Sequence, residues 1–130
     1  MTVYDSSVLI GYLVGEPTAV EYVTEHSTER AVAPPLVLFE VYQGEVFKTG
    51  PAEFDAIDSA LEWLTVVDET VELARAAAQL QNALHEQGEA LTARDAFIAG
   101  TADALGEPLV VSDADFDVPA LTDRLDVVVL

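Results

Sequence analysis

The chain has 130 residues, which indicates one domain, because domains average about 100–150 residues. Hydrophobic residues make up 51% and charged residues 22%, a balance that excludes an intrinsically disordered chain. The absence of cysteine excludes disulfides, thiolate metal sites and a cysteine nucleophile. We therefore expect one domain over residues 1–130.

No apolar run approaches the roughly 18 residues that a membrane span needs. The N-terminus also lacks the basic stretch of a secretory signal and carries an acid, Asp5, instead. These features predict a soluble, cytoplasmic protein.

The charge balance is strongly acidic. Five Lys and Arg against 24 Asp and Glu give a formal net charge of −19, which repels nucleic acids and anionic membranes at moderate ionic strength. At about 1 M salt the Debye length falls to about 3 Å, and most of this repulsion is screened. We interpret the composition as adaptation to a halophilic cytoplasm; the alternative is an acidic partner-binding surface.

Short apolar runs alternate with helical patterns, as in a parallel α/β sheet. The runs predict strands at residues 3–5, 31–33, 65–67, 109–111 and 127–129. Helical spacing predicts helices through residues 9–13, from a Thr18 cap to about 26, from 36 to about 48, from 54 through 63, from 69 to about 87, and from 92 to 105. In the third of these helices, Leu36, Phe39, Val46 and Phe47 lie near helical spacing.

Four carboxylates occupy positions where an α/β protein builds its site. Ligands bind outside the carboxyl ends of parallel strands. Asp5 ends the first predicted strand, and Asp113 lies two residues beyond the fourth. Asp95 lies in the first turn of a predicted helix, and Glu40 interrupts an otherwise apolar stretch of another.

Each carboxylate also has a purely structural explanation. Asp5 suits the N-cap of the helix that follows it. Asp95 lies three residues after Thr92, which is the spacing of a capping box.

The remaining acids have similar explanations. Asp113 and Asp115 fit a loop in which aspartates bond their own turn. Glu40 fits an outward polar stripe shared with Gln43 and Lys48.

The three aspartates between residues 113 and 117 also suggest a calcium loop. Such a loop needs glycine at its sixth place and glutamate at its twelfth. Val118 and Arg124 stand there, which argues strongly against this reading.

Four segments follow one another in a recognisable order. They are YDSSVLI at residues 4–10, LFEV at 38–41, RDAFIA at 94–99 and VVSDADF at 110–116. Together they resemble the motifs of PIN-domain nucleases, and within that family the VapC-type toxins of toxin–antitoxin pairs. The resemblance covers essentially the whole chain. The fourth motif departs from the family pattern, because Val111 replaces the usual threonine, with Ser112 beside it.

The resemblance implies a three-layer α/β/α fold with a central parallel sheet. It also implies a Mg²⁺- or Mn²⁺-dependent ribonuclease that forms a homodimer and is neutralised by a VapB-type antitoxin. The implied metal-site residues are Asp5, Glu40, Asp95 and Asp113, with Asp115 as a further candidate. The candidate substrate contacts are Arg94, Ser6 and Ser112.

The chemistry of the residues agrees with a metal site. Converging carboxylates repel one another unless a cation or a proton compensates them, and hard divalent cations prefer oxygen ligands. A catalytically silent PIN-like module that binds a partner remains the alternative.

Other mechanisms lose support at single positions. Ser6 and Ser7 have no histidine in a plausible relay position, and His26 and His85 fit ordinary surface residues. A haloacid-dehalogenase-like phosphatase needs an aspartate where Ser7 stands. A receiver domain needs a lysine late in the chain, and the only lysine is Lys48.

Overall fold

The computed structural model describes all 130 residues and contains one five-stranded parallel sheet. The strands are β1 (Thr2–Tyr4), β2 (Ala31–Ala33), β3 (Leu64–Val66), β4 (Leu109–Val111) and β5 (Val127–Val129), in the spatial order β3-β2-β1-β4-β5. At the centre of the sheet Val3 pairs with Val32 on one side and with Leu109 on the other. The predicted parallel α/β architecture is confirmed.

The three inner strands are buried and the two edge strands are not. Every residue of β1, β2 and β4 is buried, whereas β3 and β5 are partly exposed. This matches the near-continuous apolar runs, since a strand covered on both faces needs no polar alternation.

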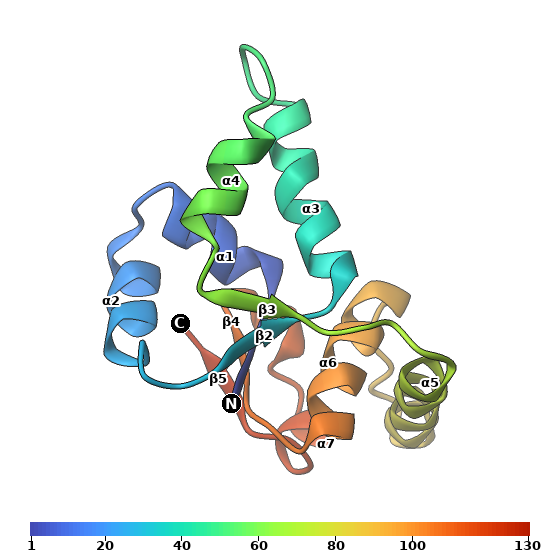
Figure 1. Ribbon diagram of the computed structural model, residues 1–130. Coiled ribbons are helices and arrows are strands. Elements are labelled where there is room, and N and C mark those ends of the chain that lie inside the picture. The colour runs from blue at the N-terminus through green and yellow to red at the C-terminus, as the bar shows by residue number, and fades with distance from the viewer.

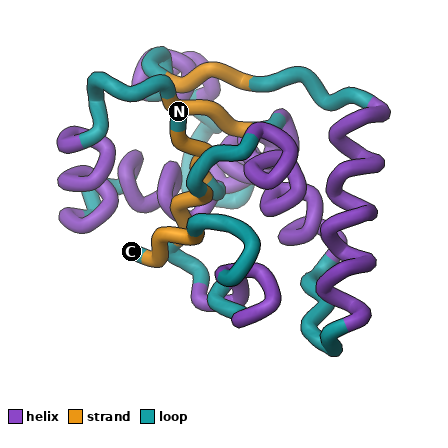
Figure 2. Tube along the Cα trace, turned by 90° about the horizontal axis from the view of Figure 1, so that it is seen from below, coloured by secondary structure: helices purple, strands orange, loops and turns teal.

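Helices cover both faces of the sheet, which gives three layers (Figures 1 and 2). They are α1 (Ser6–Leu13), α2 (Pro17–Glu25), α3 (Pro35–Val46), α4 (Phe54–Ala60), α5 (Val71–Glu86), α6 (Ala93–Leu105) and α7 (Pro119–Thr122), with a 3₁₀ turn η1 (Ala114–Phe116). The crossovers between parallel strands are right-handed. The chain steps from β1 outward to β3, which places α1 to α4 on one face of the sheet. It then returns past β1 to β4 and β5, which places α5 to α7 on the other face. No helix is both long and apolar enough to cross a membrane.

Several boundaries differ from the sequence prediction. The first and third strands each begin and end one residue earlier than expected, and α4 ends at Ala60 rather than at residue 63. Glu16, not Thr18, caps α2: its carboxylate accepts from the backbone N–H groups of Thr18 and Ala19, and Pro17 takes the first helical position. The short elements α7 and η1 were not predicted.

The outer face of α3 is exposed. Helical spacing grouped Phe39, Val46 and Phe47, but these side chains are 59%, 55% and 78% exposed. The core contacts of this helix come instead from Val37 and Val41, which are buried. Figure 1 shows why: α3 and α4 project from the sheet as a hairpin, so much of α3 has no neighbour.

The closest helix packing in the molecule joins α5 and α6. Gly100 of α6 lies against Ala77 of α5, so a Cβ built on Gly100 would meet the Ala77 Cα at 2.4 Å. Gln81 of α5 also holds the loop before α6, because its side-chain amide donates to the Leu91 carbonyl and accepts from the Leu91 N–H. These contacts fix the position of the N-terminus of α6.

Candidate active site

The predicted site lies at the centre of the sheet edge. Asp5 follows β1 directly, and Asp113 lies just beyond β4, the neighbouring strand. The strand order reverses between these two strands, since β2 and β3 lie to one side of β1 and β4 and β5 to the other. Such a switch point is where open α/β sheets place their ligands.

Asp5 both caps a helix and faces the site. Its Oδ2 accepts from the Ser7 N–H at 3.2 Å and from the Ser7 hydroxyl at 2.6 Å, so that Asp5 is the N-cap of α1. Its Oδ1 points to Arg94 at 3.0 Å. The side chain is only 1% exposed, so the charge needs this partner.

Ser7 joins the ends of the two central strands. Besides donating to Asp5, its hydroxyl oxygen accepts from the backbone N–H of Ser112 at 3.0 Å. Sequence reasoning used Ser7 to argue against serine catalysis and a dehalogenase-like phosphatase, and did not predict this link. The sequence feature that could have predicted this link is the position of Ser7 two residues after the strand-end Asp5, from which a hydroxyl can reach the ends of both β1 and β4.

Glu40 and Asp95 come to the same place from two other elements. Glu40 lies in α3 and Asp95 in the first turn of α6, and both carboxylates accept from Arg94. The outward-stripe explanation for Glu40 is therefore wrong. Its Oε1 is buried and has no hydrogen-bond partner.

Arg94 lies among three of the predicted carboxylates. Its Nε donates to Glu40, its Nη1 to Asp95, and its Nη2 to Asp5 and to the Ser6 hydroxyl at 2.7 Å. Burial alone would lower the pKa of Arg94, but the bond to Glu40 and the charges of Asp5 and Glu40 outweigh burial and raise it above its usual value. The guanidinium is permanently charged.

The carboxylate of Asp95 is buried beside Arg94. Burial raises its pKa above the usual aspartate value, and Arg94 opposes that rise only in part. Its backbone N–H donates to the Thr92 hydroxyl at 3.2 Å, so Thr92 caps α6 as predicted. The Asp95 carboxylate bonds Arg94, which makes the capping-box explanation incomplete.

Asp113 and Asp115 remain outside this group. Asp113 Oδ1 accepts from the Asp115 N–H at 2.9 Å, which is the turn bond that their spacing suggested, and Asp115 is exposed. Ser112 is exposed too and is tied to the site through its backbone. No three acidic or histidine side chains stand close enough together to hold one metal ion as they lie.

Neither histidine takes part. His26 stacks on Tyr22 and contacts the Tyr22 backbone carbonyl through Nδ1, and His85 is exposed on α5.

The four-motif pattern and the convergence of three of its acids can now be compared with known proteins. Residues 2–120 match the family model of the PIN domain. This chain belongs to the PIN-domain family.

Solved structures share the fold of this PIN domain. A chain of FitAcB from Neisseria gonorrhoeae matches with a TM-score of 0.82 at 18% identity, covering 98% of this chain and 96% of that one. VapBC from Salmonella typhimurium, solved bound to DNA, matches with a TM-score of 0.81 at 19% identity, covering 97% and 95%. VapBC2 from Rickettsia felis, bound to a fragment of its promoter, matches with a TM-score of 0.80 at 17% identity, covering 97% and 96%.

No curated protein matches this PIN domain in sequence. The structural matches therefore establish the three-layer fold, at identities too low to transfer residue roles. The roles below rest on the side chains of this chain.

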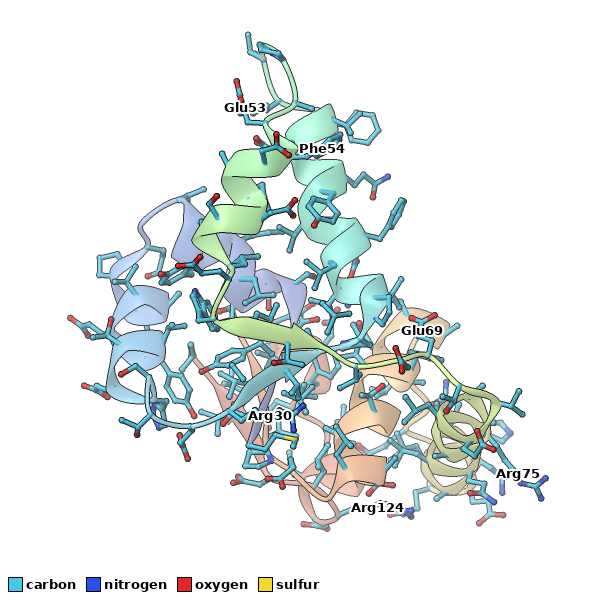
Figure 3. All side chains as sticks on the ribbon, viewed as in Figure 1. Arg30, Glu53, Phe54, Glu69, Arg75 and Arg124 are labelled. Atoms are coloured by element: carbon cyan, nitrogen blue, oxygen red, sulfur yellow. The ribbon has the colours of Figure 1, made fainter.

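The PIN domain also has an apolar groove on the projecting hairpin of α3 and α4. Five apolar side chains and Gln43 line a hollow of about 540 Å³: Phe39, Tyr42, Val46, Phe47 and Phe54. Figure 3 shows Phe54 at the outer end of α4, on the projecting hairpin. An exposed aromatic surface of this kind is typical of a protein-binding site.

Proposed function

We propose that this PIN domain is a metal-dependent endoribonuclease, the toxin of a toxin–antitoxin pair. The observation that carries the proposal is the convergence of Asp5, Glu40 and Asp95, from β1, α3 and α6, at the switch point of the sheet. Burying three carboxylates together is unfavourable for folding, so a purely structural role explains it poorly. Chemistry on a phosphodiester explains it well.

The donor atoms suit a divalent cation, although Asp5, Glu40 and Asp95 must draw closer together than they lie around Arg94 to bind one ion jointly. All the candidate ligands are carboxylate oxygens, which suit Mg²⁺ or Mn²⁺. Glu40 Oε1 is a buried oxygen without a partner, as expected of an atom reserved for a ligand. Asp5, Glu40 and Asp95 would hold the ion, and Asp113 and Asp115 would approach from the end of β4. A bound cation would supply an activated water and neutralise charge on the phosphate.

The chain's own residues orient this site and contact the RNA. Ser7 fixes the Asp5 carboxylate through two hydrogen bonds, which leaves one Asp5 oxygen for the ion. Ser112 and Arg94 are the proposed contacts to the RNA backbone, whereas Ser6, predicted as a third contact, is buried and its hydroxyl accepts from Arg94. Ser112 is exposed beside β4 and can offer its hydroxyl in place of the threonine that Val111 replaces.

We further propose a VapB-type antitoxin as partner and a homodimer as the working form. Support comes from the apolar groove, because Phe39, Phe47 and Phe54 together expose an aromatic surface that a lone chain leaves in water. Structures with the same fold are described as VapBC complexes.

An RNA cleavage assay tests the proposed activity. Wild-type protein with Mn²⁺ should cut single-stranded RNA, and chelation by EDTA should stop it. Asp5→Asn should lose activity by about two orders of magnitude or more, the scale of removing one electrostatic contributor, and should stay folded because asparagine is as good an N-cap as aspartate. Asp103→Asn, whose carboxylate pairs with Arg124 away from the site, is the matched control and should cut normally.

One observation favours the alternative, a catalytically silent partner-binding module. Arg94 already forms ion pairs with Asp5, Glu40 and Asp95, so that their negative charge is partly neutralised without a metal ion. If wild type and Asp5→Asn both leave RNA uncut in Mn²⁺ while a partner still binds the groove, the silent module is the correct function.

A further inference from the structure

The carboxylate group already contains a cation, the guanidinium of Arg94. All three of its nitrogens are engaged, with Nε on Glu40, Nη1 on Asp95 and Nη2 on Asp5. Planar guanidinium suits this task better than an ammonium, because its donors diverge in fixed directions toward separate carboxylates. One side chain therefore holds together three elements that are distant in sequence.

No other base of the chain can do this. Arg124 pairs with Asp103 and Lys48 with Glu45, and Arg30 and Arg75 form no ion pair. Figure 3 shows Arg75 pointing into solvent from α5 and Arg124 at the lower end of the molecule. In a chain with five bases and 24 acids, the position of one arginine among three carboxylates is a strong local compensation.

We propose that Arg94 and the divalent cation exclude one another, so that the arginine occupies the metal position until the ion displaces it. This rests on the metal site of the proposed function. The oxygen that Asp5 has free for an ion, Oδ1, is the one that Arg94 binds, because Oδ2 is held by Ser7. A divalent ion needs direct contact at about 2.0–2.1 Å to such oxygens, which leaves no room for a guanidinium on the same atoms.

A hollow beside Arg94 can accept the displaced side chain. Its side chain is 31% exposed, while the carboxylates of Asp5 and Asp95 are 1% and 7% exposed. Arg94 lines a shallow hollow of about 340 Å³ together with Leu36, Glu69, Ala93 and Phe97. The hollow therefore offers both apolar surface for the stem and a carboxylate, Glu69, for the displaced charge.

The proposal assigns two states to one side chain. Without metal, Arg94 compensates the buried acids and keeps the site closed. With metal, it faces solvent at the mouth of the site, where a phosphate of the RNA would arrive. The arginine therefore weakens metal binding, and its removal should strengthen it.

Calorimetric titration with Mn²⁺ measures the competition. Arg94→Gln should bind Mn²⁺ about tenfold more tightly than wild type, within the usual range of coupling between two ligands. Arg124→Gln removes the same charge away from the site and should leave the affinity within about twofold. Equal affinity of Arg94→Gln and wild type would overturn the proposal.

An NMR measurement on wild-type protein separates displacement from a simple change in charge. The Nε–H signal of Arg94, assigned by its loss in Arg94→Gln, should be protected from exchange without metal and lose protection at saturating Mg²⁺. The Arg124 signal should not change. An Arg94 signal that stays protected with Mg²⁺ bound would overturn the proposal.

The two experiments also distinguish this proposal from the function on which it rests. If wild type binds Mn²⁺ and Asp5→Asn does not, but Arg94 neither moves nor affects affinity, only the competition is wrong. If neither wild type nor Arg94→Gln binds Mn²⁺, the metal site itself is wrong and both proposals fall.

Discussion

Individual residues in this site combine a structural and a chemical role. Asp5 uses one oxygen to cap α1 and the other to face the site. In α6 the two roles are divided between neighbours, since Thr92 caps the helix and Asp95 supplies the carboxylate. A capping explanation and a catalytic one are therefore compatible at both places.

The division in α6 can be tested with a pair of substitutions. Asp95→Asn should abolish cleavage and leave the protein folded, because burial already penalises the charged form, as the raised pKa of Asp95 indicates. Thr92→Ala should do the reverse, with a loss of about 0.5–2 kcal/mol of stability and most activity retained. Urea unfolding and RNA cleavage of both variants are the measurements. Wild-type cleavage by Asp95→Asn would leave Asp95 no role in the reaction.

At this scale, sequence reasoning located the acids but not their partner. Strand ends and helix starts have predictable places at the sheet edge, so Asp5 and Asp95 could be chosen from pattern alone. Arg94 was expected at a substrate phosphate, and its bond to Glu40, 54 positions away, depends on how α3 and α6 meet. No local pattern contains that information.

The contact between α5 and α6 fixes the positions of Arg94 and Asp95. The N-terminus of α6 carries Arg94 and Asp95, and α6 is held by its close contact with α5 at Gly100 and Ala77. A tight contact of this kind transmits any displacement, because packed interiors have no spare volume.

Glycine-to-alanine substitutions test the contact. Gly100→Ala places a Cβ 2.4 Å from the Ala77 Cα and should cost about 1–3 kcal/mol, the usual range for overpacking. Gly44→Ala, in α3, meets nothing within 4 Å and should instead gain about 0.5–1 kcal/mol, because alanine favours a helix. Thermal unfolding measures both. A stabilising Gly100→Ala would mean that α5 and α6 are not in close contact.

Elements were predictable where composition and burial agree. The inner strands are apolar except for Thr2, and their positions were found to within one residue. The buried face of α3 was not predictable. Helical spacing groups Phe39 and Phe47 with other apolar residues, but it does not show whether a neighbouring element covers them. The four-residue α7 is too short to give a periodic signal.

The whole molecule presents an acidic surface that opposes its proposed substrate. With a net charge of −19 and five bases, it begins from repulsion of RNA. RNA binding by basic proteins weakens with salt, because the release of counterions into a concentrated salt solution gains less entropy. Here few phosphates can be neutralised, so the screening of repulsion should dominate.

Cleavage should therefore increase with salt. Between about 0.1 M and about 1 M KCl the Debye length shortens from about 10 Å to about 3 Å, and the rate of RNA cleavage should rise. Circular dichroism at each salt concentration controls for folding. Cleavage that is fastest in dilute buffer, with the protein equally folded throughout, would contradict the halophilic interpretation of the charge.

In the proposed enzyme, Asp5, Glu40 and Asp95 hold a divalent cation at the carboxyl end of β1. Anomalous diffraction from crystals grown with Mn²⁺ tests it most directly, because the signal locates the ion without assumptions about activity. We predict a peak in coordination contact with these carboxylates and with Glu40 Oε1, and Arg94 turned toward Glu69. An ion bound elsewhere, or no ion and Arg94 still on all three carboxylates at saturating Mn²⁺, would contradict the account.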